Sequence, residues 1–307
     1  MSKTFIFGHK NPDTDSIISS IVMEDLEKHL GNDNAIACRL GDINKETTYA
    51  LKYLKVDVPK YIESIDEGTS VILVDHNEFE QSINEIEKAK ITKVVDHHRI
   101  CGFQTAEPLF YISEPVGCTS TILFEIYKTN NIEITPTIAG LMLSAIISDT
   151  LLLKSPTTTI KDIKAVEKLA TIANIDYKIY GLDMLKAGTD LSSFSIDEIL
   201  NIDAKTISLK DKKSIIAQVN TASIPDVMKM KNNLEDRMMK IIEENNLDLF
   251  MFLITDIINS NSQVIALGNS ASIVEKAYGV KLENNTALLP GVVSRKKQVV
   301  PIMTENA

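Results

Sequence analysis

Residues 5–15 have the sequence FIFGHKNPDTD, in which a short apolar run leads directly into a histidine and two aspartates. The same arrangement recurs twice, as VILVDHN at residues 71–77 and as ITKVVDHH at residues 91–98. Short β-branched runs predict buried strands, and ligands of open α/β sheets bind beyond the carboxyl ends of the strands. Four of the five histidines of the chain lie in these segments. The three segments therefore predict one site at one edge of a sheet.

These segments supply donors that suit divalent cations. The candidate ligands are His9, Asp13, Asp15, Asp75, His97 and Asp149. The four carboxylates carry four negative charges, which two divalent ions would balance, and the two imidazoles add neutral nitrogen donors. Two metals about 3.5–4 Å apart can bridge a water and lower its pKa toward neutrality. The set therefore predicts a two-metal site for phosphoryl-transfer hydrolysis.

Each carboxylate also has an ordinary structural explanation. Asp13 or Asp15 could cap the helix expected at residues 16–30, and Asp75 could end its strand in a turn. Asp149 closes an almost wholly apolar run, where a carboxylate is costly unless it is paired or bound to metal. Taken alone, it could equally be the last residue of a helix and face water. Capping does not explain why an imidazole follows a strand three times, so the metal site is favoured.

The remaining polar residues of the three segments suggest supporting roles. The adjacent His97 and His98 point in different directions from an extended backbone, so one can bind a metal while the other faces a substrate. Asp96 could orient either ring as a hydrogen-bond partner. His76 is interpreted either as a group that supports the ligands or as an exposed side chain.

Basic residues near the C-terminus could bind an anionic substrate. Residues 294–297 have the sequence SRKK, a dense basic run in an acidic chain, and both Arg295 and Lys296 suit phosphate oxygens. A solvated turn would be the ordinary explanation of this run, as an exposed strand start would be for Lys205. We expect these basic residues to bind substrate only because the sequence also predicts a metal site.

Composition narrows the class of protein. The 307 residues predict about two domains, and 44% hydrophobic residues are enough to form buried cores. The net charge of −10 argues against nucleic-acid binding. No apolar stretch approaches the ~20 residues that span a bilayer, and residues 1–20 do not resemble a signal peptide, so we expect a cytoplasmic protein. The chain has three cysteines without CxxC spacing, which we expect to be buried small hydrophobes.

The order of predicted elements indicates an α/β protein with a mostly parallel sheet that is flanked by helices and covered on both faces. In the first domain, residues 1–187, strands are expected at 4–8 and 35–40 and before Asp75 and Asp96, and helices at 16–30, 46–54, 81–88, 118–128, 137–148, 161–173 and 178–186. Residues 188–193 form an expected linker and hinge. In the second, smaller α/β domain, residues 194–307, strands are expected at 214–219, 249–255, 264–267 and 299–303, and one long helix at 225–245. We expect the active site in a cleft between the domains.

The ordered motifs HxxPDxD at residues 9–15, DHN at 75–77, DHH at 96–98 and Asp149 resemble those of the DHH phosphoesterase superfamily. Within it, the chain is most similar to the family II, manganese-dependent inorganic pyrophosphatases. The resemblance covers the whole chain, and its second domain resembles the substrate-binding (DHHA2-type) domain of that family.

The resemblance implies a role for each candidate residue. One metal would be held by His9, Asp13, Asp75 and Asp149, and the other by Asp15, Asp75, His97 and Asp149. Pyrophosphate would be held by His98, Lys205, Arg295 and Lys296. His98 would also assist protonation of the departing phosphate, and a metal-bridged hydroxide would attack. The resemblance further implies two Mn²⁺ or Co²⁺ ions, additional Mg²⁺ with the substrate, and a cytoplasmic homodimer.

Two other functions fit the same motifs in part. A related phosphoesterase could cut polyphosphate, short oligonucleotides or cyclic dinucleotides, although relatives of the nucleotide-cleaving type usually carry a histidine in the second domain and this chain has none after His98. A metal-binding or sensor protein without catalysis is the third class, and the intact ligand set argues against it. The spacing from Asp15 to Asp75 and from His98 to Asp149 leaves no room for a nucleotide-binding regulatory insert.

Overall fold

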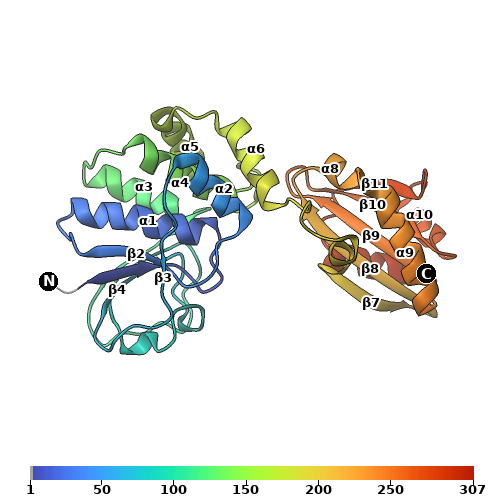
Figure 1. Ribbon diagram of the computed structural model, residues 1–307, viewed down its shortest axis with the longest axis horizontal. Coiled ribbons are helices and arrows are strands. Elements are labelled where there is room, and N and C mark those ends of the chain that lie inside the picture. Colours follow the sequence, from blue (N-terminus) through green and yellow to red (C-terminus); the bar gives the residue numbers. More distant parts are fainter. Residues whose placement is uncertain (1–2) are drawn as a thin grey trace. The chain divides into compact units, whose positions relative to one another are not determined.

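The computed structural model describes residues 3–307, which divide into two compact units between Gly188 and Thr189 (Figure 1). The division falls at the start of the segment predicted as a linker, residues 188–193. None of the helices within residues 3–307 is long and apolar enough to span a membrane. Each unit has its own sheet and its own core.

A six-stranded sheet in the order β3-β2-β1-β4-β5-β6, with every pair parallel, forms the centre of the first unit. The strands are β1 (Thr4–Phe7), β2 (Ala35–Arg39), β3 (Lys60–Tyr61), β4 (Ser70–Val74), β5 (Lys90–Asp96) and β6 (Phe110–Ser113). The predicted α/β class with a parallel sheet is confirmed. The edge strands β3 and β6 were not predicted, because β3 has only two residues, both exposed, and β6 has four, none of them fully buried.

Helices cover one face of this sheet (Figure 1). They are α1 (Thr14–His29), α2 (Lys45–Leu54), α3 (Thr119–Thr129), α4 (Pro136–Asp149), α5 (Ile160–Ala173) and α6 (Tyr177–Gly188). In β4, Ile72 and Val74 belong to the core with the helices, whereas Val71 and Leu73 belong to the core on the opposite face. Alternate residues of a strand point to opposite faces, so β4 is buried on both.

The opposite face is covered by irregular chain, and the prediction of a helix at residues 81–88 is wrong. Two single turns of 3-10 helix, Phe79–Gln81 and Ile86–Lys88, lie there instead. Glu85 between them has a φ of 60°, which no right-handed helix accommodates. Ile83 and Ile86 are nevertheless buried against the sheet. Their three-residue spacing therefore accompanies burial here without a helix.

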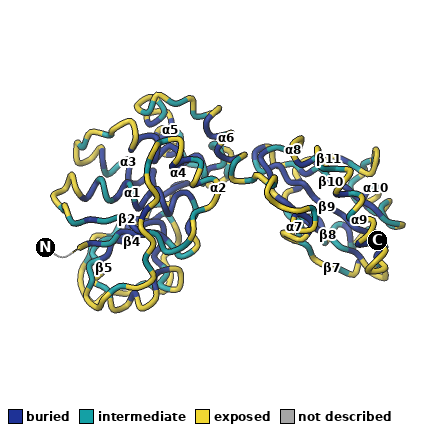
Figure 2. The backbone as a smooth tube through the Cα atoms, viewed as in Figure 1, coloured by how far each residue is buried: buried dark blue, intermediate teal, exposed yellow. Residues whose placement is uncertain are grey.

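The second unit contains a five-stranded mixed sheet in the order β11-β10-β9-β8-β7. Its strands are β7 (Ala204–Leu209), β8 (Lys212–Thr221), β9 (Leu249–Asp256), β10 (Asn261–Leu267) and β11 (Thr286–Pro290), and only β8 and β9 run parallel. Every residue of β9 is buried (Figure 2). Its alternate residues pack into two separate cores, one on each face of the sheet.

Two predictions for the second unit are wrong. The helix expected at residues 225–245 is divided into α8 (Ile224–Met228) and α9 (Lys231–Asn245). The strand expected at residues 299–303 is helical, since a turn of π-helix at Arg295–Val299 continues into α11 (Val300–Asn306). Val299 and Met303, four residues apart, are both fully buried on the same core, as one face of a helix requires. Two shorter helices, α7 (Ile196–Asn201) and α10 (Ser272–Tyr278), complete the unit.

The cysteines form no disulfide among residues 3–307. Cys38 and Cys118 are buried, as predicted, whereas Cys101 is exposed, so the expectation of burial is wrong for that residue.

Candidate metal centre

Most site residues of the first unit follow the carboxyl ends of three adjacent strands, β1, β4 and β5, and Asp149 ends α4. The connection from β1 leads toward β2 on one side, and the connection from β4 leads toward β5 on the other. The strand order therefore reverses between β1 and β4, which is where open α/β sheets bind their ligands. His9 follows β1 and Asp75 follows β4 directly, so both lie at this reversal.

The structure brings all six predicted ligands together in three overlapping groups, within each of which the donor atoms lie within 4.8 Å of one another. The groups are His9 with Asp13 and Asp75, Asp15 with His97 and Asp149, and Asp75 with His97 and His98. Tertiary structure thus brings together residues more than 100 positions apart in the sequence, such as Asp15 and Asp149. The groups share Asp75 and His97, so they form one centre.

Asp75 connects two of these groups through its two oxygens. Oδ2 lies 3.4 Å from Nε2 of His9, and Oδ1 lies 3.4 Å from Nε2 of His97. The side chain is buried, and Oδ2 accepts no hydrogen bond from any of residues 3–307. A buried carboxylate oxygen without a donor is costly, and a cation would satisfy it. The backbone of Asp75 has a φ of 58°, an uncommon conformation that is often found at functional sites.

Asp15 is fully buried in the first turn of α1 and receives hydrogen bonds from the N-terminus of α3. The backbone N–H of Thr119 donates to Oδ2 at 2.7 Å, and the backbone N–H and Oγ of Ser120 donate to Oδ1 at 3.3 and 3.0 Å. Burial and the nearby Asp75 carboxylate raise the pKa of Asp15 to about 6. These contacts aim Asp15 at the centre, and neither Thr119 nor Ser120 was predicted from the sequence.

Asp149 is the last residue of α4, whose residues 138–147 are all buried. Burial and the charges of Asp15 and Asp75 raise the pKa of Asp149 well above its ordinary value. Three carboxylates held this close repel one another when ionised. A divalent cation among them removes that cost, which is a second sign that the residues fit a metal.

The two histidines of the centre respond to the same negative charge. Burial opposes the charged imidazolium of His9, but Asp13 and Asp75 outweigh it and raise its pKa to about 10. Burial is likewise outweighed at His97 by Asp75 and Asp15, and its pKa rises to about 9. Without metal, protons take the place of cations at both rings. Nitrogen and carboxylate donors in this mixture suit Mn²⁺ and similar ions.

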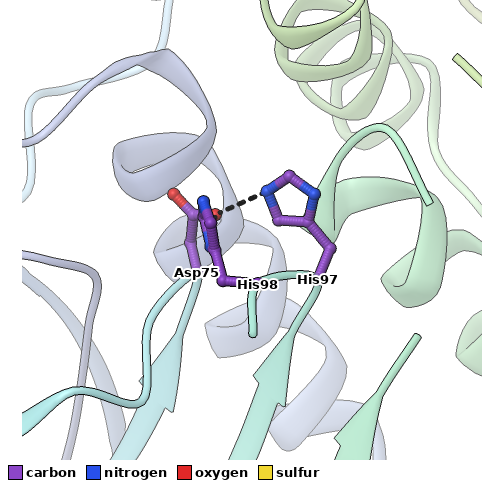
Figure 3. Close-up of side chains that lie close together, drawn as sticks. All are labelled: Asp75, His97 and His98. Carbon is purple, nitrogen blue, oxygen red and sulfur yellow. Dashed lines mark ion pairs between the residues drawn. The ribbon is translucent and has the colours of Figure 1, made fainter. Parts of the chain in front are cut away.

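His97 and His98 differ in what holds them. The ring of His97 points toward Asp75 (Figure 3), and its Nδ1 lies 3.0 Å from the carbonyl oxygen of Val116. That contact assigns Nδ1 the proton and leaves Nε2 for the carboxylates or a metal. Nδ1 of His98 lies 2.9 Å from Oδ1 of Asp96. Of the two rings that Asp96 could orient, the structure selects His98.

His76 is buried, so the interpretation as an exposed side chain is wrong. Its Nδ1 lies 2.9 Å from the carbonyl oxygen of Val74, and its Nε2 lies 3.0 Å from Oγ of Ser82. Burial lowers its pKa to about 4. The ring is therefore neutral and joins the end of β4 to the irregular segment that covers the sheet.

Asp13 combines the two roles that the sequence left open. One oxygen of its carboxylate caps α1 by accepting the backbone N–H of Ser16 at 3.0 Å, and the other oxygen lies 3.5 Å from Nε2 of His9.

Glu46, in α2, contacts the residues next to the ligands and was not predicted. It accepts hydrogen bonds from Thr14, between the two ligands of α1, and from Ser148, next to Asp149.

The predicted substrate-binding residues belong to the second unit, apart from His98. Arg295 forms an ion pair with Asp203 at 2.8 Å, and its guanidinium also donates to the carbonyl oxygen of Asp203. Asp203 lies two residues before Lys205, so the C-terminal basic run lies next to the start of β7. Lys205 and Lys296 are both exposed.

Comparison with known proteins identifies the family. Residues 3–146 match the N-terminal domain model of the DHH family, and residues 182–306 match the DHHA2 domain. The manganese-dependent inorganic pyrophosphatase of Bacillus subtilis is 56% identical over 306 residues, which cover 99% of each chain. The chain belongs to the family of manganese-dependent inorganic pyrophosphatases. The resemblance to this family that the motifs indicated is confirmed.

Solved structures extend the comparison. A Methanococcus jannaschii protein assigned to the family II inorganic pyrophosphatases is 41% identical, with a TM-score of 0.62 and 99% of each chain covered. An exopolyphosphatase-related protein from Bacteroides fragilis has a TM-score of 0.50 over 99% of this chain and 91% of the other. At 14% identity it shares the fold, and its name carries no function over to this member of the pyrophosphatase family.

Proposed function

We propose that the chain hydrolyses inorganic pyrophosphate to two phosphates at a two-manganese centre. The observation that carries the proposal is the position of Asp75, which is buried at the strand-order reversal and shared by two groups of potential ligands. Membership of the manganese-dependent inorganic pyrophosphatase family supports the same activity. The chain would therefore be an enzyme that cleaves phosphoanhydride bonds.

Two ions would be shared among the six candidate ligands. The group of His9, Asp13 and Asp75 supports one position, and the group of Asp15, His97 and Asp149 supports the other. Asp75 and Asp149 would bridge the two. When bound, the ions would neutralise the carboxylates and make a coordinated water more acidic. Co²⁺ could replace Mn²⁺, and Mg²⁺ would accompany the substrate.

The substrate would be held by His98, Lys205, Arg295 and Lys296. Asp96 accepts from Nδ1 of His98, which leaves Nε2 as the ring atom that can meet a phosphate oxygen and give it a proton. The planar fork of Arg295 suits two oxygens of one phosphate, while the lysines act as point charges. Asp15 and Asp75 complete the catalytic set by holding the metals in place.

Phosphate release by the purified protein tests the function directly. We expect rapid release from pyrophosphate with Mn²⁺ or Co²⁺ added together with Mg²⁺, and none after chelation. The same assay on tripolyphosphate and on a dinucleotide compares the rival phosphoesterases. Faster turnover of either would overturn the pyrophosphatase proposal, and no metal-dependent turnover at all would favour a binding protein.

Two further properties implied by the family resemblance stay predictions. We propose a cytoplasmic homodimer that binds neither nucleic acid nor membrane. Light scattering of the purified protein at several concentrations would test the dimer, and a monomer at every concentration would contradict it.

A further inference from the structure

Asn77 lies two residues after Asp75 and contacts no candidate metal ligand through its side-chain hydrogen bonds. It is buried, and its side-chain amide makes three hydrogen bonds. Nδ2 donates to Oδ2 of Asp96 at 2.6 Å and to the carbonyl oxygen of Arg99 at 2.8 Å, while Oδ1 accepts the backbone N–H of Cys101 at 3.0 Å. One amide therefore joins the segment after β4 to the segment after β5.

Asp96 connects Asn77 to His98 through hydrogen bonds of its carboxylate. Its Oδ1 accepts both the backbone N–H of His98, at 3.1 Å, and the ring Nδ1–H, at 2.9 Å. Among residues 3–307, Asn77 alone donates a hydrogen bond to Oδ2 of Asp96. The two oxygens of a fully buried carboxylate thus face opposite ways, one toward Asn77 and the other toward His98.

His98 depends on this support because packing holds it only in part. Its side chain is 52% exposed, and a ring with that much freedom samples other rotamers unless a hydrogen bond selects one. Without the Asn77 donor, Oδ2 of Asp96 would be a buried charged oxygen with no partner, which is costly. The carboxylate would turn to find another donor, and Oδ1 would leave the His98 ring.

We propose that Asn77 is a positioning residue, which holds the Asp96 carboxylate so that the carboxylate fixes the imidazole of His98. The inference rests on the proposed function, in which Nε2 of His98 meets the substrate. The role differs from that of the metal ligands, since Asn77 acts on a ring and leaves the cations untouched. It also differs from a merely structural role, because its effect on turnover requires His98.

A double-mutant cycle separates these roles. We expect Asn77→Ala to lower kcat about 10-fold, in the range for lost supporting hydrogen bonds, with KM and Mn²⁺ affinity changed less than about twofold. In the His98→Gln background, the same substitution should lower kcat by less than about twofold, since the ring it positions is absent. Equal factors in the two backgrounds would overturn the proposal, as would an unchanged kcat in Asn77→Ala.

A matched control and a second readout complete the experiment. Tyr180→Phe removes another buried hydrogen bond of the same unit, that of the Tyr180 hydroxyl with Ser144 at 2.6 Å. This substitution should change kcat by the same factor in the wild-type and the His98→Gln backgrounds. In Mg²⁺-loaded, ¹⁵N-histidine-labelled protein, Asn77→Ala should shift the Nδ1 resonance of His98, assigned with His98→Gln. An unshifted resonance would also refute the proposal. The resonance shift is measured without turnover, so it tests the proposal even if pyrophosphate is not the substrate. If Asn77→Ala does not fold, Asn77→Ser takes its place.

Discussion

Oδ2 of Asp75 lies 3.4 Å from Nε2 of His9, and both atoms belong to side chains that leave the sheet where its strand order reverses. The carboxylate oxygen accepts no hydrogen bond within the described part of the chain. The two groups lie within ion-pair distance, but the buried oxygen still lacks a hydrogen-bond donor and can therefore serve a third group. In this centre we take that group to be a cation.

Asp75→Asn should disrupt both metal positions at once. The amide removes the negative charge that both positions share and puts an N–H donor group in place of one oxygen, toward either His9 or His97, so we expect Mn²⁺ content to fall at both positions and kcat to fall at least about 10²-fold. Metal analysis after gel filtration, together with the phosphate-release assay, measures both effects. Asp42→Asn, at a fully exposed carboxylate of the same unit, should change neither. Full metal content in Asp75→Asn would refute the bridging role.

The affinity for Mn²⁺ should rise with pH. His9, with a pKa of about 10, and His97, with a pKa of about 9, are protonated near neutrality in the metal-free protein. Each must lose its proton to bind a metal, so each contributes up to about a tenfold gain in affinity per pH unit. Competition with a chelator of known pH dependence, between about pH 6.5 and about pH 8.5, measures the slope. A flat profile would contradict the assignment of both rings.

The stability of the metal-free protein should fall at alkaline pH. A histidine whose folded pKa is raised stabilises the fold fully below its unfolded pKa, about 6.5. That contribution is lost as pH rises through the folded values, about 9 for His97 and about 10 for His9. With Mn²⁺ bound, cations replace these protons and the dependence should disappear. Thermal unfolding with EDTA and with Mn²⁺ across this range makes the comparison, and parallel curves would count against metal at this centre.

Arg295→Ala should weaken catalysis without affecting the metals. We expect kcat/KM for pyrophosphate to fall roughly 10²–10³-fold, as for the loss of one preorganised charge contact, with Mn²⁺ affinity unchanged. Arg237→Ala is the matched control, since Arg237 is also ion-paired with acidic side chains of the second unit. Steady-state kinetics and metal titration of both variants provide the test. Equal losses in the two variants would mean that Arg295 has only a structural role.

The predictions made from the sequence succeeded where periodicity and chemistry agreed. The central strands are buried on both faces and therefore consist of continuous apolar runs, which is why β1, β4 and β9 were recognised. They failed where one pattern fits two structures. Residues 299–303 are apolar enough for a strand, yet their burial has the spacing of a helix. Residues 81–88 have the apolar spacing of a helix, but a left-handed residue interrupts them.

The amino-acid sequence by itself determined the strand-end motifs, the family and the six candidate ligands, because these depend on residue type and order. Only the tertiary structure decided which atoms meet: that Asp75 faces His9 with one oxygen and His97 with the other, and that Asp96 serves His98. It also revealed the hydrogen bonds that Thr119 and Asn77 donate, although Asn77 belongs to the DHN motif, because the motif does not say which group its amide meets. The physical reason is that strand order and side-chain orientation arise from the packing of distant segments, which no local pattern encodes.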